Sequence, residues 1–501
     1  MRRLLFFLLA LTGAFSISFP SAATPTPDDG LADDPLTAWI QRNGGGTGTD
    51  SGQKTGQVQN NGSIANLELI GHNDIGGRGF NADIYAHKGF AYIGQWGFGI
   101  SNFPKFCPAG DTADPRNGVK ILDLHAPGLP IVGTLRSPAW TSAEDITVFT
   151  PLFGPRQGRD IAAVGLQACF RRDNSIPRGL QLWDVTDPRT PEKLGFVSSG
   201  DNIRGVHELS IVQRPDLVTR KQAGKVLALE AVNFSQTFDA AGRGDLRIVD
   251  ITDPSAPAEI GNWALREIGL TNQFTGTGCF ARTFGHSASA TADGKTAFLS
   301  AFDAGELVLD ITDPTRPRFV RRARYPANES GDMDTHSADV TNDGRFLLVQ
   351  DEDECRSNDM KNQVGWGYLR IFDLASRDAN GDLVEIGTFK TPHSEANNDP
   401  SNGNYTIHHT AQNPAWSSTK VAISWYSDGV RVVDMAPVLS GAATTPSEVA
   451  SFVPPAFNDP VGSCACLGNS AFVWGVVVAD DGLIVISDMN SGVWVVRETH
   501  R

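Results

Sequence analysis

One short β-strand motif recurs along this chain at a nearly constant spacing. Three of its copies read GLQLWDVTDP at 179–188, DLRIVDITDP at 245–254 and GELVLDITDP at 305–314. The Asp that ends the strand, or the Arg in its place in the last copy, stands at positions 123, 184, 250, 310, 373, 434 and 497. The gaps are therefore 61, 66, 60, 63, 61 and 63 residues. A period this regular is typical of a repeat architecture in which each unit packs against its neighbours.

Each copy has the pattern of a strand followed by a turn. Apolar and polar residues alternate within the strand, and β-branched residues are frequent. In three copies Thr-Asp-Pro follows, where the Asp side chain can bond the backbone and the proline restricts φ. Another short strand comes next, such as LGFV at 194–197, and hairpin signals such as Asn342-Asp343-Gly344 separate the two strands before the motif. Each unit is thus expected to contain four antiparallel strands.

The motif strand, the Thr-Asp-Pro turn and the period resemble those of the LVIVD-repeat family of bacterial and archaeal surface proteins, over residues 64–501. The resemblance implies a β-propeller but no single activity. Seven units in one ring predict an all-β domain at 63–501, a seven-bladed β-propeller of four-stranded blades. The last unit shows only three strands, so residues 64–73 are expected to supply the missing strand of the last blade and to close the ring.

The N-terminal residues predict export from the cytoplasm. Arg2 and Arg3 precede an apolar stretch at 4–19, and small residues follow, which is the pattern of a secretory signal peptide at 1–23. Residues 24–62 are rich in Gly, Thr, Pro, Asp, Asn and Gln and predict a disordered linker. The expected location is secreted, periplasmic or cell-surface. No later stretch is long and apolar enough to predict a membrane span.

Charge narrows the expected partners. The formal net charge is −15 at pH 7, which disfavours nucleic acid and anionic lipid as partners. An extracellular protein, a polysaccharide or a small molecule is expected instead.

The cysteines of an exported chain predict disulfides more readily than metal ligands. All of them fall in loops on the face of the ring opposite the tight turns. Cys107 and Cys169 follow the second strands of neighbouring units, and Cys279 and Cys355 also come from neighbouring units, so two bridges are predicted. The last two cysteines pair with each other in one interpretation, although other pairings stay open. The six cysteines are Cys107, Cys169, Cys279, Cys355, Cys464 and Cys466.

Five of the ten histidines lie in one repeated register at the start of the innermost strands, and four of them hold the same position in it. In a propeller these residues ring the mouth of the central channel, so their side chains are expected to converge. Imidazoles mixed with carboxylates suit one divalent transition metal, namely Zn, Fe, Cu or Mn. The neighbouring His409 shares the repeat position of Glu208. The predicted metal ligands are His207, His286, His336, His408, Glu144 and Glu208.

A second set of carboxylates ends the second strands on the same face. The predicted ligand-binding residues of this set are Asp303, Asp351, Asp353 and Glu230. The acidic run at 351–354 could hold Ca²⁺ through oxygen ligands, although a solvated loop is the preferred interpretation.

The histidine column leaves different classes of function open. A binding scaffold would use the long-loop face, and its histidines would be satisfied by backbone groups. An enzyme, either an oxidoreductase or a polysaccharide lyase or hydrolase, would need imidazoles that converge with room left over. Its chemistry could use a metal to activate water, or a histidine base without metal. In the structural alternative, each histidine bonds the adjacent blade and helps to hold the ring together.

Overall fold

The computed structural model describes residues 62–97, 107, 116–219, 223–277, 281–325, 333–353, 366–396, 404–456 and 470–499. The predicted signal peptide and, except for Gly62, the predicted linker lie outside these residues. The first described strand is β1 (Ser63–Ala65).

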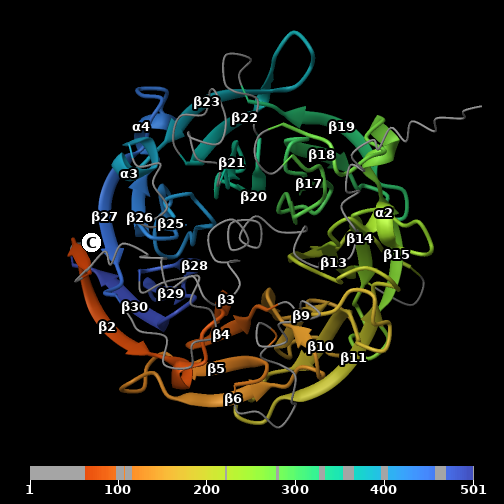
Figure 1. The fold of residues 1–501 in the computed structure, drawn as a ribbon, viewed down its shortest axis with the longest axis horizontal. Helices are drawn as coiled ribbons and strands as arrows, with labels where there is room; N and C mark the ends of the chain where they lie inside the picture. Colours follow the sequence, from red (N-terminus) through yellow and green to blue (C-terminus); the bar gives the residue numbers. More distant parts are fainter. Residues whose placement is uncertain are drawn as a thin grey trace, which may run out of the picture.

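The strands encircle a central axis, and successive strands of a unit run outward from that axis (Figure 1). The first sheet contains β3 (Asn81–His87), β4 (Phe90–Gln95), β5 (Val119–Asp123) and β6 (Ile131–Leu135). The second contains β7 (Thr141–Ser142), β8 (Ile146–Phe149), β9 (Ile161–Ala168), β10 (Gly179–Asp184) and β11 (Glu192–Ser198). The third contains β12 (Leu209–Arg214), β13 (Lys225–Ala231), β14 (Leu246–Asp250) and β15 (Ala258–Trp263).

The second half of the ring repeats this arrangement. One large sheet contains β16 (Ser287–Ala290), β17 (Thr296–Ser300), β18 (Glu306–Asp310), β19 (Arg318–Ala323), β20 (Thr335–Val340), β21 (Phe346–Asp351), β22 (Leu369–Arg377) and β23 (Leu383–Phe389). Another contains β24 (Thr410–Ala411), β25 (Lys420–Trp425), β26 (Gly429–Asp434), β27 (Ser447–Val453) and β1 (Ser63–Ala65). The last contains β2 (Leu67–Asn73), β28 (Val473–Val478), β29 (Leu483–Asp488) and β30 (Gly492–Glu498).

Helices are few and short among the described residues. They are the 3₁₀ turns η1 (Ile75–Gly77) and η3 (Leu265–Ile268) and the helices α2 (Ser235–Phe238), α3 (Pro392–Ala396) and α4 (Ala436–Leu439). The all-β class predicted from the sequence is confirmed.

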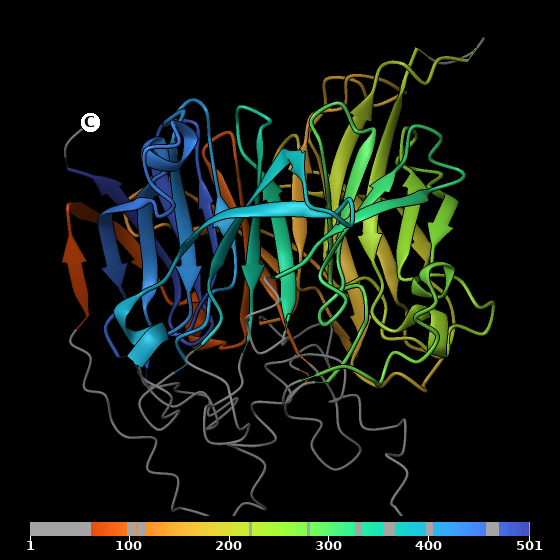
Figure 2. The same ribbon diagram turned by 90° about the horizontal axis from the view of Figure 1, so that it is seen from above.

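The described strands form six sheets, and not seven separate ones as the sequence predicts. The eight-stranded sheet arises because β19 and β23 meet in parallel through one residue pair, Ala323 with Leu383. The hairpin between β22 and β23 reaches β19, where Asp382 accepts a hydrogen bond from the Arg322 amide at 3.1 Å and pairs with Arg324 at 2.9 Å. Figure 2 shows this hairpin crossing the side of the ring. A local latch therefore merges two units of the repeat.

Residues 67–73 close the ring as expected from the sequence, whereas Ile64 and Ala65 lie in β1, which pairs with β27 of the preceding sheet. β2 pairs antiparallel with β30, from Leu67 opposite Glu498 to Asn73 opposite Val493. The His72 ring stacks on Trp494 with 3.7 Å between ring centroids. The two ends of the domain thus belong to one sheet.

The recurring motif forms the third strand of each unit, between the second and the outermost strand. The Asp that ends it bonds the following turn, since the amide of Thr186 donates to Asp184 Oδ1 at 3.0 Å and that of Thr252 to Asp250 Oδ1 at 3.1 Å. Apolar motif residues fill the space between neighbouring sheets, as Ile248 of β14 and Leu307 of β18 do within one cluster. The motif thus supplies both the Asp that stabilises the turn and the apolar side chains that pack between sheets.

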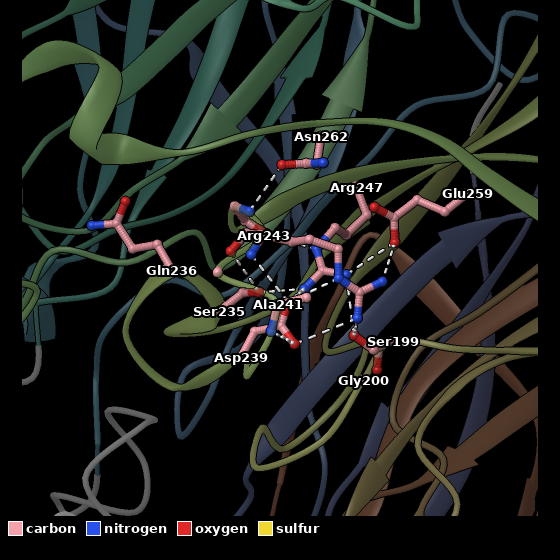
Figure 3. Close-up of polar contacts among 12 residues, drawn as sticks. Ser199, Gly200, Ser235, Gln236, Asp239, Ala241, Arg243, Arg247, Glu259 and Asn262 are labelled. Carbon is pink, nitrogen blue, oxygen red and sulfur yellow. Dashed lines mark hydrogen bonds and ion pairs between the residues drawn. The ribbon is translucent and has the colours of Figure 1, made fainter.

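A polar residue at the third motif position ties neighbouring sheets together. Arg247 is fully buried, and its Nη1 donates to Ser199 O at 3.1 Å and to Glu259 Oε2 at 3.0 Å (Figure 3). Arg243 donates to the same Ser199 carbonyl at 2.6 Å and pairs with Asp239 at 2.8 Å. Because Ser199 follows β11 of the preceding sheet, this network joins two units.

Glu306 occupies the second motif position of its copy, where Leu246 stands in the copy that contains Arg247. It is fully buried, and its Oε2 accepts a hydrogen bond from the Ser300 hydroxyl at 2.7 Å. Burial raises the pKa of Glu306 from 4.5 to about 8, against the lowering effect of that hydrogen bond. The carboxyl is therefore protonated in the folded protein at neutral pH.

Because Glu306 is protonated in the folded protein, we expect Glu306→Gln to change the free energy of unfolding in a pH-dependent way. The folded protein keeps a proton that the unfolded chain releases above pH 4.5, so the wild type loses stability as the pH rises towards 8. The amide variant avoids this loss and is expected to gain on the order of 5 kcal/mol at most above pH 8, with little difference near pH 4. Urea denaturation of both proteins across this range measures the difference. A difference that does not change with pH would contradict the assignment.

Candidate functional site

Each unit of the histidine column begins its inner strand with a β-bulge, in which two residues face one residue of the second strand. The His207 amide donates to Ala231 O at 2.9 Å, and the Ala231 amide donates to Glu208 O at 2.8 Å. At a bulge the alternation of side chains between the two faces is interrupted, so consecutive residues can be directed to one region. The same irregularity occurs at His286-Ser287, His336-Ser337 and His408-His409.

The first residues of these bulges form an arc of four imidazoles, here called the histidine arc: His207, His286, His336 and His408. Ring centroids of successive members lie 4.2, 4.1 and 4.1 Å apart. The Nε2 atoms of His207 and His286 are 2.7 Å apart. All four residues are buried, with at most 2 % of their surface exposed. The sequence prediction that these side chains converge is therefore met by the geometry.

Carboxylates surround the histidine arc. Glu144 Oε2 lies 2.5 Å from His207 Nδ1. Glu208 Oε1 lies 3.5 Å from His336 Nε2, and Glu352 Oε2 lies 3.6 Å from the same nitrogen. Glu352 also accepts a hydrogen bond from the Tyr426 hydroxyl, which orients its carboxylate.

Burial keeps the histidine arc neutral. Burial lowers the pKa of all four imidazoles well below 6.5, and repulsion from other basic side chains, His409 among them in each case, lowers it further. The neutral imidazole is the form that binds transition metals. His408 Nδ1 lies 2.8 Å from Trp474 O, which leaves Nε2 directed towards Glu352 at 3.9 Å. A backbone contact at one ring nitrogen is the usual way in which a metal-binding histidine is oriented.

Four side chains from the starts of inner strands form a different group, here called the channel floor: Asp83, Asp145, Glu208 and His409. His409 Nε2 lies 3.3 Å from Asp83 Oδ1 and 3.4 Å from Glu208 Oε1. Although burial opposes it, these two carboxylates raise the pKa of His409 well above 6.5. Burial, together with Asp83 and Glu208, raises the pKa of Asp145 well above its usual value.

A cavity of about 680 Å³ extends from the channel floor to the hairpin turns. Its inner end is lined by the channel floor with Ser287 and Ser337. At its other end lie Lys88 and Asp481, whose side chains are 56 % and 43 % exposed. The cavity therefore reaches solvent on the face that carries the tight turns.

This geometry corrects the expected position of the histidines. The sequence places them at the mouth of the channel on the long-loop face, but the histidine arc is buried and does not line the cavity. Trp474 packs against His408 with ring centroids 4.3 Å apart and covers that side. The physical reason is the bulge, because only the second residue of each pair faces the channel.

A comparison with protein families adds one match. The LVIVD-repeat profile matches residues 239–264, which include β14 and β15. This chain carries an LVIVD repeat within its ring of sheets.

Other comparisons add little on function. The LVIVD-repeat protein is similar to the solved β-propeller domain of Myceliophteria thermophila Cps50 (Swd1), with 13% sequence identity and a TM-score of 0.47. The likeness covers 84% of this chain and 97% of that one. No curated protein matches the sequence. Within the described residues, no helix has the length and apolar character needed to cross a membrane.

Two of the four carboxylates predicted to bind a ligand contact other groups of the LVIVD-repeat protein through their side chains. Asp351 pairs with Arg370 at 3.1 Å. Asp303 accepts hydrogen bonds from the Arg282 amide at 2.8 Å and from the Thr277 hydroxyl at 3.1 Å.

The other two carboxylates also give no support to a calcium site. Glu230 is buried, and burial raises its pKa to about 8. The backbone carbonyl of Asp353 accepts a hydrogen bond from the Gly367 amide at 2.9 Å. Since Asp351 faces an arginine and Glu354 lies outside the described residues, nothing in the described part of this run favours Ca²⁺.

Four residues of the site were not among the predicted ligands: Asp83, Asp145, Glu352 and His409. In a regular strand the side chains of His408 and His409 would point to opposite faces. Strand alternation therefore does not predict that His409 belongs to the site. The signal that could have found it is the repeated pair of polar residues at strand entry, as in His207-Glu208 and Glu144-Asp145.

The structure joins Cys107 and Cys169 in a disulfide, with 6.0 Å between their Cα atoms. This bridge links the first two units. Cys279, Cys355, Cys464 and Cys466 lie outside the described residues, so their predicted pairings remain predictions.

Glycines in the second strands give the next inner strand room to approach. A Cβ on Gly94 would lie 2.1 Å from Glu144 O and 2.8 Å from Ala143 O, both backbone atoms. A Cβ on Gly165 would lie 3.1 Å from a Val206 methyl group and 3.2 Å from its carbonyl. The second strand at Gly94 therefore lies closer to the inner strand of the second unit than the second strand at Gly165 lies to that of the third.

Gly94→Ala is therefore expected to displace the backbone at Glu144 and to destabilise the protein by about 1–3 kcal/mol. Gly165→Ala is the matched control, and a smaller loss is expected because its closest contact is a methyl group. Urea denaturation of both variants measures the two losses. Equal losses, or a larger loss for Gly165→Ala, would contradict this account of the packing.

Proposed function

We propose that this LVIVD-repeat protein is an exported metal-binding β-propeller that holds one divalent transition metal in the histidine arc. The metal would be Zn, Fe, Cu or Mn. The observation that carries the proposal is the set of four neutral, buried imidazoles from four different inner strands, with successive rings 4.1–4.2 Å apart. Nitrogen donors with nearby carboxylates suit these metals and do not suit Ca²⁺.

Unsatisfied ring nitrogens support a ligand in the arc. His286 Nδ1 and His408 Nε2 are buried and have no hydrogen-bond partner within the described residues. Leaving a buried polar atom unpaired costs about 1–3 kcal/mol, and a metal ion would remove that cost. In the structural alternative each histidine would bond the backbone of the adjacent unit. Such a contact is seen for His408 with Trp474 O and for His286 with the backbone of His336, within the described residues.

The distances between donor atoms agree with shared coordination. Two ligand atoms bound about 2.1 Å from one metal at a tetrahedral angle lie about 3.4 Å apart. Glu208 Oε1 lies 3.6 Å from His286 Nδ1 and 3.5 Å from His336 Nε2. These separations are too long for good hydrogen bonds, so they favour metal ligands over direct hydrogen bonding.

Two further features belong to this proposal. We count β16–β19 and β20–β23 as separate blades that are joined by a latch, so that the ring is seven-bladed and β2 completes the last blade. Export rests on the signal-like residues 1–23 and on the Cys107–Cys169 bridge, since disulfides persist in oxidising compartments.

A second candidate function is catalysis on a small molecule. The cavity of about 680 Å³ is within the usual range for small-molecule sites and ends at the channel floor, beside the histidine arc. A metal held at the channel floor could supply Lewis acidity to a substrate oxygen. The floor carries both an imidazole and carboxylates that could move a proton. A cavity of this size favours a small substrate over a polysaccharide.

Elemental analysis of the purified protein tests the metal site. The double variant His286→Ala/His336→Ala is expected to hold one equivalent of transition metal less than the wild type, with a folded circular dichroism spectrum. The control is His125→Ala/His393→Ala, in which both side chains are more than half exposed, and it is expected to match the wild type. Equal metal content in all three proteins, after reconstitution, would reject the site.

A further inference from the structure

We infer that Asp83, Glu208 and His409 form a second divalent metal site, which shares Glu208 with the histidine arc and faces the channel. The three residues come from different units of the ring. One oxygen or nitrogen atom from each lies within 4.8 Å of the others. The inference depends on the proposed function at one point, since Glu208 would bind both the metal in the arc and the second metal.

The separations around His409 are those of ligands on one ion. His409 Nε2 lies 3.3 Å from Asp83 Oδ1 and 3.4 Å from Glu208 Oε1. Ligand atoms bound about 2.1 Å from a metal at a tetrahedral angle lie about 3.4 Å apart. Glu208 Oε1 and Asp83 Oδ2 are buried atoms without a hydrogen-bond partner in the described residues, and the Glu208 side chain is only 6 % exposed.

The balance of charge also favours a cation. Three carboxyl groups, those of Asp83, Asp145 and Glu208, gather around the single imidazole of His409. Buried carboxyl groups that lie close together ionise more readily beside an opposite charge. A divalent ion that displaces the His409 proton would supply twice the charge of the imidazolium that it replaces. The Leu209 amide donates to Asp145 Oδ2 at 2.6 Å, so this carboxylate already has a partner, and it is the other two that a divalent cation would engage.

Exposure separates the roles of the two sites. The arc histidines are almost fully buried, while the His409 side chain is 18 % exposed and lines the cavity. Three protein ligands with an open position directed at a cavity are the pattern of catalytic metal sites, whereas a ligand set closed to solvent is that of structural sites. The second metal would therefore bind a small channel ligand through an oxygen atom, such as a phosphate or carboxylate.

The test counts metal ions in the full mature protein. Chelator-treated protein is titrated with Zn²⁺, and bound metal is measured after desalting, for the wild type, Asp83→Asn, His409→Gln and the arc variant His286→Ala/His336→Ala. The wild type is expected to hold two equivalents. Asp83→Asn and His409→Gln are each expected to hold one, with the affinity of the second site reduced more than about 100-fold, since loss of residues that only support a ligand costs 10–100-fold.

The outcomes separate the two proposals. One equivalent in the wild type, lost in the arc variant and retained in Asp83→Asn and His409→Gln, would overturn the second site and leave the arc. One equivalent lost in Asp83→Asn and retained in the arc variant would overturn the arc and leave the second site. No bound metal in any protein would overturn both.

A spectroscopic measurement tests the open position and the shared ligand. In protein loaded with Co²⁺, inorganic phosphate is expected to change the visible spectrum of the wild type but not that of Asp83→Asn. In protein loaded with Mn²⁺, electron paramagnetic resonance is expected to show coupling between two ions, which Glu208→Gln abolishes. An unchanged Co²⁺ spectrum, or uncoupled Mn²⁺ in the wild type, would reject the open, bridged site.

Discussion

The β-bulge at the start of the inner strands is the constraint on which the site depends. In a regular strand, His207 and Glu208 would face opposite sides of the sheet. In the bulge, the backbones of both residues pair with Ala231, so the regular alternation of side chains is interrupted. The His207 side chain joins the buried histidine arc, and the Glu208 side chain joins the channel floor. Repetition of this irregularity in neighbouring units turns one local backbone feature into two groups of side chains around the axis.

The surrounding ring makes this arrangement rigid. Motif strands are paired on both sides, and buried charged residues such as Arg247 bond the backbone of the preceding sheet (Figure 3). The pairing of β2 with β30 leaves no open seam between the first and last units. A site assembled from residues of several units needs such a frame, because small shifts between sheets would separate its side chains.

Electrostatics change along the axis in a way that suits a metal-centred channel. The histidine arc is buried and neutral, since burial lowers the pKa of its imidazoles. The channel floor concentrates carboxylates around His409, and the pKa of that histidine rises as a consequence. Lys88 and Asp160, 2.6 Å apart, lie towards the turn face and bring opposite charges together there. Negative charge is thus concentrated at the buried end, where a cation would bind.

The amino-acid sequence by itself determined the strands, the turns and the order of the ring. The motif period, the Asp that caps each turn and the strand-like residues 64–73 are local signals, and each has its counterpart in the structure. The repeated position of His207, His286, His336 and His408 was also legible, because residues in equivalent positions of a ring must converge on its axis.

Only the tertiary structure decided which side chains share a site and from which side it is reached. The bulge depends on hydrogen bonds to the second strand, which the sequence does not show. Strand alternation alone therefore gave no place for His409 in the site and put the other histidines at an open channel mouth. Glu352 contacts the arc while Asp351 turns to Arg370, a choice made by packing between units. The union of two units through Ala323 and Leu383 depends on a hairpin that meets a strand 60 residues away in sequence. Such contacts are set by long-range pairing, which no local pattern encodes.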